Sequence, residues 1–139
     1  MRTIAVVALL IVGAAPSEKE KLQGPWFATV YTTDGEVLTT ASSGVKPDMV
    51  LDGDKLVLYG HSAGTYKLGE TKYHTTIDFR YVGIFGGYKT ERGIYKLEGD
   101  TLTICSADEP APRPDVFTAP AGSKRKLYVY SRKPVTPNP

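Results

Sequence analysis

Cys105 is the only cysteine in the 139-residue chain, so it is the first candidate for chemistry. A reactive thiol needs a lowered pKa, from a neighbouring cation or a helix N-terminus, and a base within hydrogen-bond reach. Cys105 ends the run TLTIC on the face opposite Leu102 and Ile104, and no histidine lies near it in the sequence. Unless the fold brings His61 or His74 beside it, we expect a small, partly buried strand residue without a catalytic role. A single cysteine also excludes an intramolecular disulfide and any multi-cysteine metal site.

The two histidines and Asp78 are the other residues whose types suit catalysis or metal binding. His74 and Asp78 lie four residues apart in the alternating run YHTTIDF, which puts them on one strand face about 13 Å apart. A shared metal ion would need a bulge, and it would also need His61 to converge with them. A hydrolase that uses His61, His74 and Asp78 stays as an alternative, although Ser62 lacks the G-x-S-x-G elbow of a serine nucleophile. We therefore predict no catalytic residue, no metal and no cofactor.

The charged segments give no clear binding site either. Asp52-Gly53-Asp54 offers too few oxygens for calcium and is typical of a hairpin turn. The basic run Lys124-Arg125-Lys126 is typical of a solvated turn. Because 17 basic residues nearly balance 15 acidic ones, we expect no nucleic-acid partner.

Apolar residues alternate with a period of two along most of the chain, which predicts half-buried strands. The residues that share a face are Trp26, Ala28 and Val30; Leu56 and Leu58; Tyr66 and Leu68; Ile77 and Phe79; Tyr95 and Leu97; Leu102 and Ile104; and Leu127 and Val129. Three acidic-glycine turns, at Asp34-Gly35, Asp52-Gly53 and Glu98-Gly99, predict hairpins. A capping box that begins at Ser17 predicts one short helix before Gly24-Pro25. The fold class is therefore all-β, an antiparallel up-and-down β-barrel of about eight strands with a short N-terminal helix; a two-sheet sandwich is the alternative.

Two segments interrupt the alternation. Residues 81–92, YVGIFGGYKTER, are rich in glycine and predict a long hairpin loop. Residues 106–123 carry four prolines, which cannot donate to a full hydrogen-bond ladder, so we expect an irregular strap over one end of the barrel. The C-terminal KPVTPNP is expected to be a frayed tail.

The N-terminal segment predicts secretion. Residues 1–14 comprise a positive charge at Arg2, an apolar run from Ile4 to Val12 and small residues, which is the pattern of a signal peptide cleaved after Ala14. The apolar run is far shorter than the roughly 20 residues that span a bilayer, so we expect no stable membrane insertion. We assign residues 15–139 to a single domain located outside the cytoplasm, secreted or periplasmic in the cell envelope.

Gly24-Pro25-Trp26 forms a G-x-W motif after the short helix, at the start of the first predicted strand. This arrangement resembles the lipocalin (calycin) signature. In that family the tryptophan closes the base of the barrel and packs against an arginine from the last strand. The last predicted strand here, LYVYSR, supplies Arg132. The resemblance therefore implies that Trp26 and Arg132 form a structural plug at the base.

A closer resemblance covers nearly all of the chain after residue 14. The order LQGPW, LDGDKLVL, GTYKL, TIDF, GIYKLEGDTLTIC and PRPDVF, followed by a short apolar strand with arginine, resembles a family of uncharacterised secreted bacterial domains of planctomycete type. The most specific element is GIYKLEGDTLTIC, with Cys105 in register. The resemblance implies a lipocalin-like barrel outside the cytoplasm and implies no activity. The apolar segment from Arg80 to Thr90 departs from the pattern, because a polar linker is expected there.

These observations favour a non-catalytic lipocalin-like module that binds a small apolar ligand inside the barrel. The residues we expect to line the interior are Trp26, Tyr66, Phe79, Tyr95 and Ile104. The alternative is a structural or protein-interaction barrel with an interior filled by side chains. The volume of the interior separates the two, because ligand sites begin at about 300 Å³. The sequence identifies no protein partner.

Overall fold

The computed structural model describes residues 15–38, 46–83 and 85–134. Its elements are α1 (Glu18–Leu22), β1 (Gly24–Thr33), β2 (Glu36–Leu38), β3 (Met49–Asp52), β4 (Lys55–Leu58), β5 (His61–Glu70), β6 (Thr75–Val82), β7 (Tyr88–Glu98), β8 (Thr101–Asp108) and β9 (Arg125–Ser131). The predicted signal peptide and the end of the predicted tail lie outside the described residues. No helix in the described ranges is long and apolar enough to cross a bilayer.

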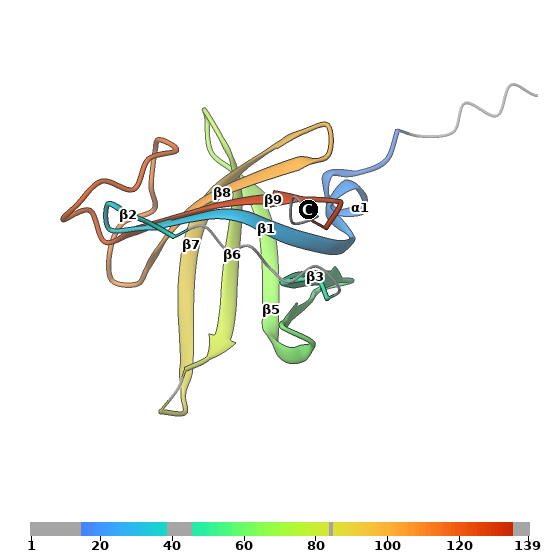
Figure 1. The fold of residues 1–139 in the computed structure, drawn as a ribbon, viewed down its shortest axis with the longest axis horizontal. Coiled ribbons are helices and arrows are strands. Elements are labelled where there is room, and N and C mark those ends of the chain that lie inside the picture. The colour runs from blue at the N-terminus through green and yellow to red at the C-terminus, as the bar shows by residue number, and fades with distance from the viewer. Residues whose placement is uncertain (1–14, 39–45, 84, 135–139) are drawn as a thin grey trace, which may run out of the picture.

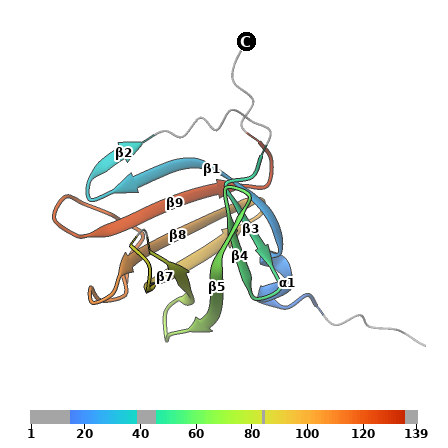
Figure 2. The same ribbon diagram turned by 90° about the horizontal axis from the view of Figure 1, so that it is seen from below.

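The strands form one antiparallel sheet that closes on itself. From β3 to β9 each strand pairs with its neighbour in sequence, and β1 pairs with both β3 and β9. In the described part of the chain, eight strands therefore form a closed, lipocalin-like barrel, with α1 beside the start of β1 (Figures 1 and 2). The ninth strand, β2, pairs only with the far end of β1. The predicted all-β barrel is confirmed, and the two-sheet sandwich is wrong.

The three acidic-glycine turns connect hairpins as predicted. They join β1 to β2, β3 to β4 and β7 to β8. Gly35, Gly53 and Gly99 have φ angles of +86°, +60° and +59°. Glycine adopts this left-handed conformation without the steric cost that a Cβ atom brings, so these dipeptides fix the hairpins locally.

A β-bulge changes the faces of β1. The register between β1 and β9 shifts between Ala28 and Val30, which leaves Thr29 as the extra residue. Before the bulge Trp26 and Ala28 face the barrel core, and after it Tyr31 pairs with Tyr128. The predicted common face of Trp26, Ala28 and Val30 is therefore wrong beyond the bulge, because an inserted residue reverses the alternation.

The segment 81–92 contains much more strand than predicted. Only residues 83–87 separate β6 from β7, and pairing continues to Val82 and Tyr88. This hairpin projects at the bottom of Figure 1. The long loop expected over this segment is wrong, because its glycines are confined to the tip and the flanking residues pair regularly.

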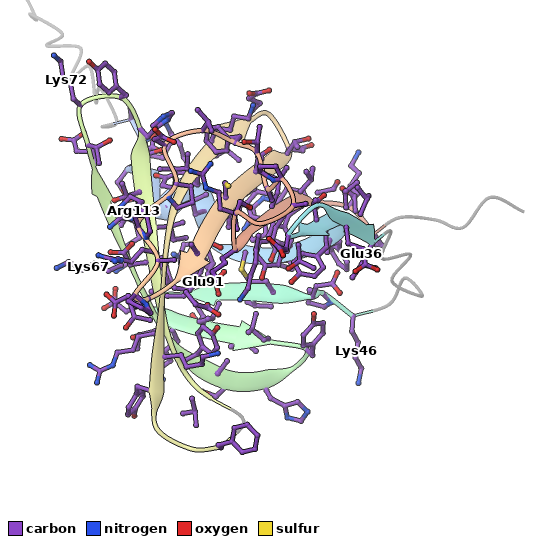
Figure 3. The ribbon with its side chains drawn as sticks, turned by 90° about the vertical axis from the view of Figure 1, so that its left-hand side faces the viewer. Glu36, Lys46, Lys67, Lys72, Glu91 and Arg113 are labelled. Carbon is purple, nitrogen blue, oxygen red and sulfur yellow. The ribbon has the colours of Figure 1, made fainter. Side chains whose placement is uncertain are left out.

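The proline-rich connection runs along the outer wall of the barrel rather than over its end. We call residues 109–124 the strap. Arg113 reaches from the strap to Asp78 on β6 and to the carbonyl oxygen of Gly93 on β7 (Figure 3). Farther along, the carbonyl oxygen of Thr118 lies 3.5 Å from the sulfur of Cys105 on β8. The expected position over one end is wrong, because the strap covers apolar outward-facing residues of the sheet.

Candidate ligand-binding cavity

Trp26 closes one end of the barrel, which we call the base. Its side chain has no exposed surface, and its Nε1 donates a 2.9 Å hydrogen bond to the carbonyl oxygen of Leu22 in α1. The guanidinium carbon of Arg132 lies 3.6 Å from the centre of a Trp26 ring, within the range of a cation–π contact. Arg132 also donates to the carbonyl oxygens of Lys21 and Gln23, at 2.6 and 2.8 Å. The helix, the first strand and the last strand therefore meet at this contact.

Tyr66 and Tyr95 belong to the same end of the barrel. The hydroxyl of Tyr66 donates to the carbonyl oxygen of Gly53 at 2.5 Å and accepts from Nε2 of Gln23 at 2.6 Å. The hydroxyl of Tyr95 donates to Glu18 in α1 at 3.0 Å. Burial, followed by the contact with Glu18, raises the pKa of Tyr95 to about 12. These two side chains fasten the helix to the barrel.

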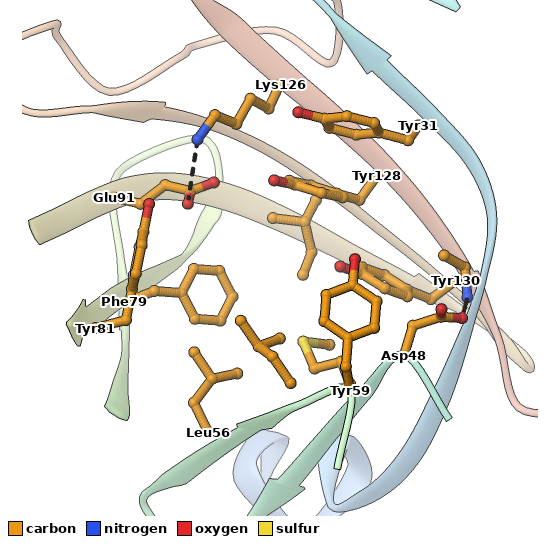
Figure 4. A pocket seen from close by; sticks show the side chains of 14 residues that line it. Tyr31, Asp48, Leu56, Tyr59, Phe79, Tyr81, Glu91, Lys126, Tyr128 and Tyr130 are labelled. Atoms are coloured by element: carbon orange, nitrogen blue, oxygen red, sulfur yellow. Dashed lines mark hydrogen bonds and ion pairs between the residues drawn. The ribbon is translucent and has the colours of Figure 1, made fainter. Parts of the chain in front are cut away.

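A cavity of about 600 Å³ lies between this base and the other end of the barrel (Figure 4). Its apolar residues, which we call the floor, are Ala28, Met49, Leu56, Leu58, Phe79 and Ile104. Five tyrosines also line it, namely Tyr31, Tyr59, Tyr81, Tyr128 and Tyr130. Three charged residues, Asp48, Glu91 and Lys126, complete the lining. The cavity thus combines an apolar floor with aromatic and polar walls, which is the usual composition of a small-molecule site.

Three of the tyrosines form a stacked ladder. The ring centres of Tyr31 and Tyr128 are 4.8 Å apart with an angle of 23° between the planes. Those of Tyr128 and Tyr130 are 5.8 Å apart at 14°. Tyr31 reaches the ladder because the bulge in β1 turns it inward, while Tyr128 and Tyr130 are alternate residues of β9.

Glu91 is a buried carboxylate in the cavity wall, with 6% of the residue exposed. It accepts a hydrogen bond from the Ser106 hydroxyl, and its Oε2 lies 3.7 Å from Nζ of Lys126. The same Nζ lies 3.1 and 3.3 Å from the two carboxylate oxygens of Asp108. Lys126 is therefore shared between two carboxylates, and this network satisfies the buried charge of Glu91.

Burial raises the pKa of several cavity tyrosines further above neutral pH. Burial and then the Glu91 carboxylate raise the pKa of Tyr81 to about 12. The same two causes, in the same order, raise the pKa of Tyr128 and of Tyr130 above the ordinary value of 10.0. A neutral phenol keeps its hydroxyl proton, so these side chains offer hydrogen-bond donors and uncharged ring faces at neutral pH.

The five residues expected to line the interior are divided by the structure. Phe79 and Ile104 line the cavity. Trp26, Tyr66 and Tyr95 pack in the core at the base and are not among the lining residues. All five belong to the buried core of the barrel, but the sequence pattern did not show where along the axis the packed core gives way to open space.

The polar lining was missed by the sequence reasoning, although the sequence carries a signal for one of its members, Glu91. Glu91 is two and four residues before Gly93 and Tyr95, so the alternation of β7 carries it to the inner face. In β9 the residues paired by the pattern, Leu127 and Val129, do share a face, but it is opposite the one that lines the cavity. The residues of β9 that face inward are Tyr128 and Tyr130. The residues on both faces of this strand are apolar enough to be buried, so the pattern alone does not indicate which face is inward.

The residues of the alternative hydrolase do not come together. His61 is at the start of β5 and His74 just precedes β6, beyond the other end of β5, which is about 30 Å of strand. His74 Nε2 forms a 2.7 Å hydrogen bond with the carbonyl oxygen of Asp115 in the strap. Asp78 is held by both terminal nitrogens of Arg113, at 2.5 and 3.1 Å. Within the described ranges, no group of three or more His, Cys, Asp or Glu side chains is placed to hold a metal ion.

Cys105 is fully buried rather than partly buried, on the outer face of β8 under the strap. Burial raises the pKa of its thiol, and the smaller opposing effects of the Arg125 charge and of the Thr118 backbone do not reverse this. A thiol that stays protonated is a poor nucleophile. The residue therefore packs the strap against the barrel.

Comparisons with known proteins return no matching family model, no matching curated protein and no matching solved structure. The resemblance to planctomycete-type secreted domains therefore stays a prediction from the motif order. The function has to be argued from the cavity itself.

Proposed function

We propose that this protein is a non-catalytic binding module that holds a small, largely apolar molecule in the barrel. The observation that carries the proposal is the cavity of about 600 Å³, which is twice the lower limit of about 300 Å³ for ligand sites. Its floor of Leu56, Phe79 and Ile104 offers apolar contact, and the tyrosine hydroxyls offer hydrogen bonds. When a small apolar molecule binds here, its own apolar surface and that of the floor are both removed from water, which favours binding.

Two observations weigh against the other functions considered. A purely structural barrel would fill its interior with side chains, as small barrels do, whereas this interior stays open above its base. A hydrolase built on His61, His74 and Asp78 would require them to converge, and the strands hold the two histidines at opposite ends of β5.

The proposal includes a location outside the cytoplasm and membership of the planctomycete-type family of secreted domains. The support for the location is the signal-like pattern of residues 1–14, and the support for the family is the motif order from LQGPW to PRPDVF. The location would be tested by expressing the full chain in a bacterial host and determining whether the mature N-terminus in the periplasm is Ala15.

Titration with the uncharged dye N-phenyl-1-naphthylamine tests ligand binding in the cavity. We expect saturable fluorescence enhancement with a stoichiometry of about one dye per chain. Ala28→Phe and Leu58→Trp place larger side chains in the cavity, so each should weaken binding by about tenfold or more. Thr65→Phe adds a similar ring on an exposed position of β5 and serves as the matched control.

The dye experiment has a clear opposing result. If the filling variants stay folded by circular dichroism and bind the dye as tightly as the wild type, the cavity is not the binding site. If the wild type does not bind at all, the proposal of an open ligand site fails.

A further inference from the structure

Asp48 is the one charged residue of the cavity lining without an ionic partner among the described residues. Its Oδ2 accepts a 2.6 Å hydrogen bond from the backbone N–H of Ala28, and no ion pair to it occurs in the described ranges. Residues 39–45, TTASSGV, include no lysine, arginine or histidine. By contrast, the two other charges of the lining, Glu91 and Lys126, pair with each other. The described part of the lining therefore carries one negative charge without an ionic partner.

The backbone holds Asp48 firmly in place. Its N–H donates to the carbonyl oxygen of Trp26 at 3.0 Å, and its own carbonyl oxygen accepts from the N–H of Tyr59 at 3.1 Å. The residue is thus fixed between the start of β1 and the β4–β5 turn. A carboxylate held this way is preorganised, because little conformational entropy is lost when it binds a ligand.

Aromatic rings lie around this carboxylate. Figure 4 shows Asp48 beside Tyr59 and Tyr130, with Glu91 and Lys126 on the other side of the cavity. Burial is the largest cause that raises the pKa of Tyr130, and the charge of Glu91 follows. The charge of Asp48 also contributes, which agrees with the position of Asp48 beside Tyr130 in Figure 4. Neutral phenol rings present an electronegative face, which attracts cations within about 6 Å.

Tyr59 is an unusual choice for the turn that it occupies. Its φ is +52° and that of Gly60 is +81°, a combination that normally selects Asn-Gly or Asp-Gly. A tyrosine in this conformation carries a steric cost, and 73% of its surface is exposed, so packing does not explain it. A ring placed here at a conformational cost is consistent with contact to a ligand.

An anionic ligand fits this cavity poorly. The single lining ammonium, Lys126, is already within 3.1 to 3.7 Å of Asp108 and Glu91. A ligand carboxylate or phosphate at Lys126 would face both of those carboxylates, and Asp48 would repel it as it entered. Like charges that are brought close together repel each other, so the arrangement selects against anions.

We propose that the cavity binds organic cations, with a ligand ammonium group against Asp48 between the rings of Tyr59 and Tyr130 and its apolar part over Leu56 and Phe79. This inference rests on the proposed binding function and names its ligand class. The combination of one carboxylate and several aromatic faces suits a primary amine or a quaternary ammonium.

Three amphiphiles with the same decyl chain test the charge preference: decyltrimethylammonium, decanol and decyl sulfate. Each would be used below its micelle concentration to displace N-phenyl-1-naphthylamine. We expect the cation to bind about tenfold more tightly than decanol, and the sulfate to bind most weakly. Equal affinities for the three, or tighter binding of the sulfate, would overturn the inference.

Asp48→Asn tests the residue that carries the preference. The amide oxygen can still accept from the Ala28 N–H, so the fold is expected to persist. We expect decyltrimethylammonium to lose about tenfold in affinity while decanol is unchanged. Asp52→Asn removes an exposed carboxylate at the end of β3, the strand that begins just after Asp48, and should leave both affinities unchanged.

A second variant covers the case in which Asp48→Asn does not fold. Tyr59→Leu removes the aromatic face and should weaken the cation but not decanol, whereas Tyr59→Phe should retain cation binding. If decanol and the dye bind but neither variant reduces the preference for the cation, the inference fails and the binding function stands. If neither the dye nor any amphiphile binds the wild type, both fail.

Discussion

Replacing Trp26 by alanine is expected to be the most destabilising single change at the base of the barrel. The side chain is completely buried, and truncation of a buried tryptophan costs about 3–5 kcal/mol. The change also leaves the carbonyl of Leu22 without its donor and the Arg132 guanidinium without its ring, each worth about 1 kcal/mol. We therefore expect a loss in the upper half of that range, about 4–5 kcal/mol. At about 4 °C per kcal/mol for a chain of this size, the midpoint of thermal unfolding should fall by about 16–20 °C.

The assay is urea and thermal unfolding followed by far-ultraviolet circular dichroism, because Trp26 is the only tryptophan and its variant loses the indole signal. Trp26→Phe is the matched control: it keeps a ring beside Arg132 and removes the donor to Leu22, so we expect about 1–2 kcal/mol. A loss below about 1 kcal/mol for Trp26→Ala would refute the reasoning, because the base would then not depend on this contact.

Three further predictions concern the walls of the barrel. A Cβ at Gly64 would lie 1.9 Å from the backbone oxygen of Arg80, so Gly64→Ala should cost about 3 kcal/mol or more in urea denaturation, and a near-neutral result would contradict this close strand approach. Cys105→Ser should cost only about 1 kcal/mol and leave dye binding unchanged, since a serine hydroxyl can donate to the Thr118 carbonyl; the wild-type thiol should react with a disulfide reagent only after unfolding. Tyr81 has a folded pKa of about 12 against 10.0 for the ordinary phenol, so its contribution to stability is present below pH 10 and is lost as the pH rises from 10 through about 12. The urea midpoint should therefore be constant from about pH 7 to 9 and fall above pH 10, and a midpoint that rises there would contradict the burial of the phenol.

The barrel could be predicted because its signals are local. Alternation along short segments defines strands, and Asp34-Gly35, Asp52-Gly53 and Glu98-Gly99 define three hairpins through the positive φ of glycine. Once consecutive strands pair antiparallel, closure between the first and last strands removes both edges. No long-range contact had to be known to reach this architecture.

The cavity lining could not be predicted because it depends on which face of each strand is turned inward. In β9 the rows Leu127/Val129 and Tyr128/Tyr130 are both apolar, and the sequence contains no signal that ranks them. The position of the strap was missed for a similar reason. Its contacts with Cys105 and Asp78 join residues 13 and 35 positions apart in the sequence. The proline content shows only that the segment does not form a strand with a full hydrogen-bond ladder.

The bulge at Thr29 connects the fold to the proposed site. If Thr29 paired regularly in place of forming a bulge, alternation from Trp26 and Ala28 would turn Val30 inward and Tyr31 outward. The base would be unchanged, but the tyrosine ladder would lose its β1 member. Thr29 is anchored by a 3.0 Å hydrogen bond from its hydroxyl to the carbonyl oxygen of Val129, so the bulge is tied to the strand that supplies the other two rings. One strand thereby supplies an apolar plug at one end of the barrel and an aromatic wall at the other, and this division leaves the interior packed at the base and open above it.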